Sequence, residues 1–219
     1  MRKDIFSTGE FYHVFNRGVD KRNITVDISD TDRLQMSFYE FNTIEPIGSI
    51  YENSFNKNKK TERQKRPVDI VCYCINPNHF HLILKQREDG GISRFMQRVG
   101  TGYTKYFNNR HKRSGALFQG VFKGLHISTN EKLLQLSVYV NLNYKVHQLG
   151  SEASKLVRSS WGEYFIKTKV SNLVELCEKD IILEQFKSHL DYKNFASETL
   201  PTLLEEKERE KELAVLMIE

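Results

Sequence analysis

The chain has 219 residues, 39% of them hydrophobic, and a formal net charge of +5. This length is enough for one domain with an extension. No apolar run approaches membrane-spanning length, and the N-terminal segment lacks the apolar region of a secretory leader, so we expect a cytoplasmic protein without membrane contact. Cys72, Cys74 and Cys177 form no C-x-x-C pair, which argues against a disulfide framework and fits reduced thiols.

Hydrophobic periodicity and turn residues predict the first elements in chain order. We expect a strand over 10–17, a helix over 31–42 capped by Asp30, a loop or basic insertion over about 45–66, and strands over 68–75 and 79–86. An Asn76-Pro77-Asn78 turn joins the last two strands, because proline presets the turn backbone and asparagine tolerates the conformation that follows.

The second half of the chain begins with a predicted helix opened by Gly90-Gly91. Its apolar stripe at helical spacing indicates core packing and comprises Ile92, Phe95, Met96, Val99, Tyr103 and Tyr106. A short strand follows near 122–127, and a capping box at Ser128 opens a helix over about 131–146. The order strand, helix, strand, strand, helix, strand predicts an α+β fold with a ferredoxin-like antiparallel sheet.

The distribution of charge is more informative than its total. From Gly90 to Asn130 the chain has no Asp or Glu but carries seven basic residues, Arg94, Arg98, Lys105, Arg110, Lys112, Arg113 and Lys123. We call this stretch the basic block. A short charge run is usually a solvated face, but an acid-free stretch of this length favours a polyanionic partner such as nucleic acid.

His79 and His81 alternate with Phe80 on a predicted strand. Successive strand side chains point to opposite faces, so both imidazoles project to one side while Phe80 points to the other. Two imidazoles side by side form half of a metal site. The alternative is a pair of surface histidines, which is the more common meaning of an isolated H-x-H.

The helix predicted over 131–146 carries a polar strip between two apolar flanks. Gln135, Tyr139 and Asn143 are spaced four residues apart and therefore stack on one helix face. Polar groups held against a sheet need partners. The strip is explained equally well by an amphipathic core tyrosine or by Tyr139 and Asn143 facing His79 and His81.

Together these residues are suited to nucleophilic chemistry on phosphate. A tyrosine hydroxyl can attack phosphorus and form a covalent intermediate, although its phenol is a weak nucleophile at a pKa near 10. A divalent metal on two histidines and an amide oxygen neutralises phosphate charge and orients the scissile bond. The ligand types alone leave the metal open, because imidazole also suits Zn²⁺ and Ni²⁺.

Several ordered motifs resemble one family. They are YHVFNRGVDKRNI at 12–24, CINPNHFHLILKQ at 74–86, the segment 92–124, YVNLN at 139–143 and SSWGEY at 159–164. Over residues 10–165 the chain resembles the single-tyrosine HUH transposases of the insertion-sequence-200-like group, in particular the REP-associated tyrosine transposase branch. The resemblance implies an HUH endonuclease-type fold and metal-dependent cleavage of single-stranded DNA near hairpins.

The resemblance also implies a role for each matching residue. Tyr139 matches the nucleophile, His79 and His81 match the metal-binding histidines, and Asn143 matches the third ligand, with Mg²⁺ or Mn²⁺ as cofactor. Attack would leave a 5′-phosphotyrosine and a free 3′-hydroxyl, so that rejoining needs no ATP. We expect phosphate contacts from Arg17, Lys21, Arg22, Arg110, Lys112, Arg113 and Lys123.

The resemblance divides the chain into a catalytic domain over 1–150, which includes the basic insertion, and a partly helical C-terminal extension over 151–219. The implied partner is single-stranded DNA with hairpin-forming ends or repeats, and a homodimer stays open. Two other functions also stay open. One is a catalytically inactive protein that binds DNA hairpins, and the other is a metal-dependent hydrolase that uses water as the nucleophile.

Overall fold

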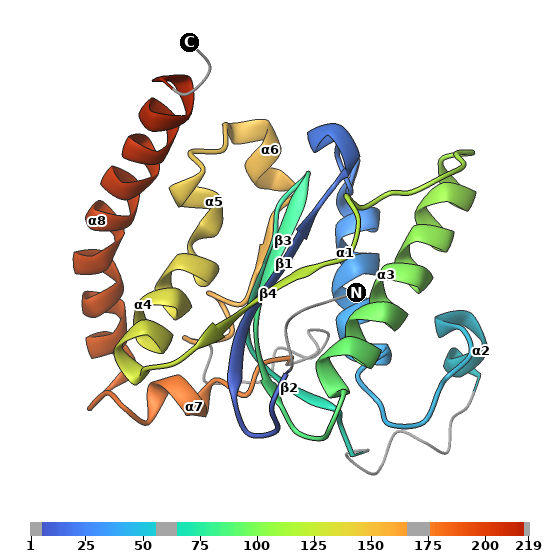
Figure 1. Cartoon of the computed structure of the whole chain (residues 1–219), viewed down its shortest axis with the longest axis horizontal. Helices are drawn as coiled ribbons and strands as arrows, with labels where there is room; N and C mark the ends of the chain where they lie inside the picture. The colour runs from blue at the N-terminus through green and yellow to red at the C-terminus, as the bar shows by residue number, and fades with distance from the viewer. Residues whose placement is uncertain (1–5, 56–64, 166–175, 217–219) are drawn as a thin grey trace.

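The computed structural model describes residues 6–55, 65–165 and 176–216, and it is built around one antiparallel sheet (Figure 1). The strand order is β4-β1-β3-β2-β5. The strands are β1 (Phe11–Arg17), β2 (Val68–Ile75), β3 (His79–Gln86), β4 (Lys123–Ile127) and β5 (Arg158–Ser159). The first four have the order and connections of a ferredoxin-like sheet, so the predicted α+β fold is confirmed.

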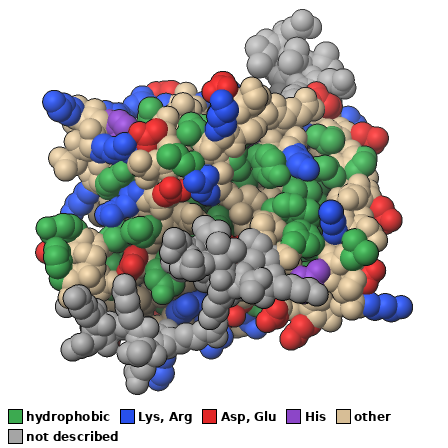
Figure 2. All heavy atoms as spheres, turned by 180° about the vertical axis from the view of Figure 1, so that it is seen from behind, with side chains coloured by type: hydrophobic (Ala, Val, Ile, Leu, Met, Phe, Trp, Pro, Cys, Tyr) green, Lys and Arg blue, Asp and Glu red, His purple; other side chains and the backbone are tan. Residues whose placement is uncertain are grey.

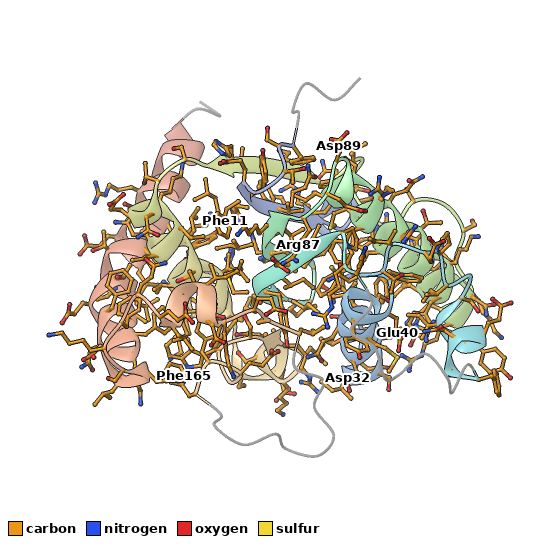
Figure 3. The ribbon with its side chains drawn as sticks, turned by 90° about the horizontal axis from the view of Figure 1, so that it is seen from below. Phe11, Asp32, Glu40, Arg87, Asp89 and Phe165 are labelled. Atoms are coloured by element: carbon orange, nitrogen blue, oxygen red, sulfur yellow. The ribbon has the colours of Figure 1, made fainter. Side chains whose placement is uncertain are left out.

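Helices cover both faces of the sheet. One layer contains α1 (Ile28–Glu40) and α3 (Gly91–Arg110), and the other contains α4 (Asn130–Asn141) and α8 (His189–Leu216) (Figure 1). Seen from below in Figure 3, Asp32 and Glu40 of α1 lie on one side of the strands and Phe165 on the other. The remaining short elements are η1 (Val19–Lys21), α2 (Ile50–Ser54), α5 (Asn143–Val146), α6 (Ser151–Lys155) and α7 (Asp180–Leu183).

Strand alternation divides the apolar residues between two cores. Phe80, Leu82 and Leu84 of β3 pack in the core beneath α1 and α3. Ile83 points the other way, into the core beneath α4 and α8. The predicted strands over 68–75 and 79–86 are therefore confirmed, including the face to which the histidines belong.

The α1–α3 contact depends on a glycine. A Cβ on Gly102 would lie 2.5 Å from the Phe41 ring, so the two helices pack this closely only because α3 has no side chain there. The predicted core stripe of α3 is also confirmed: its members are buried, except Tyr106, which is partly buried and packs against the same core.

Three predicted local features were wrong. Helix α1 begins at Ile28 behind Asp27, whose side chain accepts from the backbone N–H of Asp30, so Asp30 is not the cap. The predicted loop over 45–66 contains the short helix α2, which a capping box at Ser49 opens; residues 56–64 lie outside the described part. The cap of α4 is Thr129, not Ser128.

The helix predicted over 131–146 is broken. Helix α4 ends at Asn141, Leu142 has φ −109° and ψ 19°, and α5 begins at Asn143. Tyr144, which follows the break, packs against the core that contains Cys74 of β2. No proline or glycine marks the break in the sequence.

A buried carboxylate ties α1 to the C-terminal end of α3. Asp30 is fully buried and accepts from Arg110 Nη1 at 2.6 Å and from Val26 N at 3.0 Å. His111 Nε2 at 2.9 Å and the Tyr106 hydroxyl at 3.4 Å also contact this carboxylate. A buried carboxylate with several donors stabilises the fold only while those donors remain.

We predict that Asp30→Asn lowers the free energy of unfolding by about 2 kcal/mol, because the amide cannot accept from all of these donors. Asp32→Asn is the matched control, since Asp32 lies on the same helix in a half-exposed ion pair with Arg158 and should change stability by about 0–1 kcal/mol. Urea unfolding measures both. Equal midpoint shifts in the two variants would show that the Asp30 cluster does not support the α1–α3 contact.

Candidate functional site

A cleft of about 1020 Å³ opens on the α4 side of the sheet. Its floor consists of the end of β1 and the start of β3, and α4 and α8 provide walls. The cleft lining includes His79, His81 and Tyr139, residues far apart in the sequence.

His79 lies in a cluster of amide groups. Its Nδ1 donates to Asn78 Oδ1 at 2.6 Å, so in the neutral ring Nε2 is the nitrogen that carries the lone pair. Asn76 Nδ2 donates to that Nε2 at 2.8 Å and also to Asn143 Oδ1 at 2.7 Å. His79 Nε2 of β3 and Asn143 Oδ1 of α5 are 3.0 Å apart. Both atoms carry lone pairs, and both lie next to the Asn76 amide nitrogen.

His81 is held by a third histidine. His13 of β1 and His81 lie next to each other on neighbouring strands, with His13 Nε2 2.8 Å from His81 Nδ1 and the rings 5.0 Å apart. When His81 Nδ1–H donates to His13 Nε2, the His81 Nε2 keeps its lone pair. His13 was not singled out by the sequence; its place in the YHV motif, on the same face as Phe11 and Phe15, was the available signal.

Burial keeps these imidazoles neutral. It lowers the pKa of His13 to about 4, with a smaller contribution from the Lys132 charge. Burial is also the main cause that lowers the pKa of His79 and of His81. Neutral imidazole is the form that binds metal ions, so near pH 7 the cluster is in the ligand-competent state.

Tyr139 faces the histidines across the cleft. Its ring lies 5.5 Å from the His81 ring at an angle of 86°, and 5.9 Å from the His13 ring at 81°. Gln135, one turn earlier on α4, also lines the cleft, and Asn143 follows on α5. The polar strip therefore faces the sheet at the histidines.

Other tyrosines have structural positions. Tyr103 is fully buried, and its hydroxyl donates to the backbone oxygen of Ile24 at 2.6 Å on the other side of the sheet. Tyr144 is the nearest in sequence, and burial raises its pKa. Neither lines the cleft among the described residues.

The cleft also gathers cations. Arg17, Lys21 and Lys123 of the predicted DNA-binding set line it, together with Lys132 and Lys207, which the sequence did not single out. Gly18 allows the tight turn that carries Lys21, because a Cβ there would lie 2.1 Å from the Arg22 backbone oxygen. Most of these cations come from outside the basic block, so a search limited to charge runs could not find them.

The other predicted DNA-binding residues lie elsewhere. Arg110 pairs with Asp27 and Asp30, and Arg22 pairs with Asp20. Arg113 donates to Asn108 and lies over the Phe107 ring, beside the exposed Lys112. None of these four lines the cleft. Figure 2 shows charges of both signs interspersed on the face turned away in Figure 1.

The donor set fits a divalent cation. His79, His81 and His147 each offer a nitrogen, and these atoms lie within 4.8 Å of one another. Asn143 Nδ2 is buried without a hydrogen bond, so the contacts that orient this amide are made by its oxygen, which faces His79. Two ligands at right angles around an octahedral ion, each about 2.1 Å from it, lie about 3.0 Å apart, which matches the His79–Asn143 separation.

The fold and the cleft thus define an α+β protein with an imidazole cluster that faces a tyrosine among cations. Residues 48–143 match the family model described as "Transposase IS200 like". The predicted resemblance to this family is confirmed, and the match supports a transposase function, that is, an enzyme that acts on DNA. No curated protein sequence matches the chain.

The fold matches a solved structure. Its description is "Structure of the REP associates tyrosine transposase bound to a REP hairpin". The two chains are 13% identical, with a TM-score of 0.52, over 81% of this chain and 93% of the other. This likeness shows a shared fold. None of the described helices is long and apolar enough to cross a membrane.

Proposed function

We propose that this protein cleaves and rejoins single-stranded DNA through a covalent bond between Tyr139 and a 5′-phosphate. The observation that carries the proposal is the position of Tyr139, edge-on to His81 in a cleft lined by cations. The transposase family match supports DNA as the substrate. The relative of similar fold is described as bound to a REP hairpin, which supports hairpin-forming DNA in particular.

The chemistry proceeds at one phosphodiester. The Tyr139 oxygen forms a bond to phosphorus, the phenolic proton is released, and the bond to the 3′ oxygen breaks as that oxygen takes up a proton. The phosphotyrosine keeps the energy of the original bond, so a 3′-hydroxyl of another strand can reverse the step. The products of cleavage are a 5′-phosphotyrosine and a free 3′-hydroxyl.

His79, His81 and Asn143 would hold a divalent cation next to the scissile phosphate. Such a cation neutralises phosphate charge and orients the bond for attack. The residues of this chain supply the rest: His13 orients His81, Asn76 donates to Asn143 Oδ1, and α4 positions the tyrosine hydroxyl. Positioning of this kind accounts for much of the catalysis in phosphoryl transfer.

The cations of the cleft would bind the DNA backbone. Arg17, Lys21 and Lys123 lie on the β1 and β4 side, and Lys132 lies on α4, so a strand crossing the cleft meets positive charge from both walls. Contacts of this kind position DNA without reading its sequence.

Tyr139→Phe should abolish the covalent adduct and leave DNA affinity within a few-fold, because only the attacking oxygen is removed. Tyr144→Phe is the matched control and should form adduct normally, since Tyr144 does not line the cleft. Labelled single-stranded hairpin DNA with Mn²⁺ on a denaturing gel gives the readout. Cleavage without adduct in Tyr139→Phe would indicate a water nucleophile, and DNA binding by the wild type without cleavage would indicate a binding protein.

His79→Ala and His81→Ala should each remove detectable Mn²⁺ binding. His13→Phe should weaken it by about 10–100-fold, because the orienting partner of a ligand is lost. His126→Ala is the control, since His126 is half-exposed on β4 and pairs with Glu10. Calorimetric titration of metal-free protein measures all four. Unchanged Mn²⁺ affinity in both ligand variants would contradict the assigned site.

Neutralising Lys21 and Lys123 together should make the log–log salt dependence of DNA affinity shallower by about 1.4, since single-strand contacts contribute about 0.7 per phosphate. The loss should be similar for different DNA sequences. Replacing Lys85 and Lys187, which lie outside the cleft, is the control and should leave the slope unchanged. Fluorescence anisotropy over a salt series distinguishes the two. An unchanged slope in the Lys21 and Lys123 variant would exclude these cations from the DNA path.

A further inference from the structure

His147 lies beside the two histidines of β3. Its ring is 4.6 Å from the His79 ring, and its ligand nitrogen lies within 4.8 Å of those of His79 and His81. His147 caps the C-terminus of α5, and its backbone N–H donates to the backbone oxygen of Asn143 at 2.9 Å. The break at Leu142 thus begins a short helix from which Asn143 and His147, one turn apart, both reach His79.

A third imidazole changes the ligand chemistry of the site. The family resemblance implies two histidines and one amide oxygen, whereas the described residues bring three imidazoles together. Mg²⁺ prefers oxygen ligands and keeps several waters, and imidazole is a preferred ligand of transition metals. The described His, Cys, Asp and Glu residues that converge here are all histidines, so no carboxylate of this cluster compensates for the poor match to Mg²⁺.

We propose that His147 is a ligand of this site and that the site therefore selects a divalent transition metal over Mg²⁺. The proposal rests on the metal-binding part of the proposed function and not on cleavage. His79, His81 and His147 provide the nitrogens, and the Asn143 oxygen is the fourth donor, 3.0 Å from His79 Nε2.

The experiment titrates metal-free protein with Co²⁺, followed by its visible absorption, and separately with Mg²⁺ by calorimetry. Wild type should bind Co²⁺ much more tightly than Mg²⁺. His147→Ala should weaken Co²⁺ binding at least about tenfold and alter the absorption spectrum, with little effect on Mg²⁺. His126→Ala, a histidine replacement outside the cleft, should behave as wild type.

His147→Gln keeps a side chain of similar length and offers an oxygen in place of a nitrogen. It should lower the ratio of Co²⁺ to Mg²⁺ affinity while urea unfolding remains as in wild type, which separates a ligand role from a folding defect. Wild-type Co²⁺ affinity and spectrum in both His147 variants would overturn the proposal. Equal affinity of the wild type for Mg²⁺ and Co²⁺ would also overturn it.

The outcome is independent of DNA chemistry. Tyr139→Phe should leave the Co²⁺ spectrum of the metal-loaded protein unchanged, because the tyrosine is not among the proposed ligands. If His147 variants lose Co²⁺ while no adduct forms with any metal, the proposed cleavage fails and the ligand assignment stands. If adduct forms normally with Mg²⁺ in His147→Ala and Co²⁺ binding is unchanged, the ligand assignment fails and the proposed cleavage stands.

Discussion

The amide of Asn76 joins the two halves of the site. It is fully buried at the end of β2, and its nitrogen donates to His79 Nε2 of β3 and to Asn143 Oδ1 of α5. A buried amide must find partners, and here the partners are two proposed metal ligands. This contact fixes the distance between the sheet and the broken helix, and the placement of Tyr139 and His147 depends on that distance.

No proline or glycine marks the break between α4 and α5, so the local sequence does not predict it. Leu142 leaves the helical conformation, and Tyr144 after it packs against the core that contains Cys74 of β2. After the break, the side chain of Asn143 in α5 contacts His79 of β3. A continuous helix would place residues after 142 along the axis of α4, so the bend is what brings a fourth donor within reach of the histidines.

The charged groups have different roles on the two faces of the sheet. Burial lowers the pKa of His79 and His81, so the cleft holds neutral ligands surrounded by exposed cations. On the opposite face of the sheet, Asp27 and Asp30 pair with Arg110, so a conspicuous charge of the basic block stabilises α1 against α3.

Much of the fold was readable from the sequence because it depends on local patterns. The sequence predicts strands β2 and β3, and alternation predicts the correct faces of β3. The four-residue spacing of Gln135, Tyr139 and Asn143 predicts a polar strip that the structure places opposite the histidines. The same four-residue spacing continues from Asn143 to His147, so the pattern in the sequence includes His147 as well.

The rest depends on contacts between distant segments. The pairing of Arg110 with Asp27 spans more than eighty positions, and the hydrogen bond from Asn76 to Asn143 spans 67. No periodicity reports such contacts, because they are set by how two helix layers and a sheet pack.

The most direct test of the central claim is mass spectrometry of the protein–DNA adduct after trypsin and nuclease digestion. The expected peptide spans 133–145 and contains both Tyr139 and Tyr144, so fragment ions must locate the nucleotide. The account predicts a 5′-phosphonucleotide on Tyr139. A nucleotide on Tyr144, or on any residue outside the cleft, would contradict it.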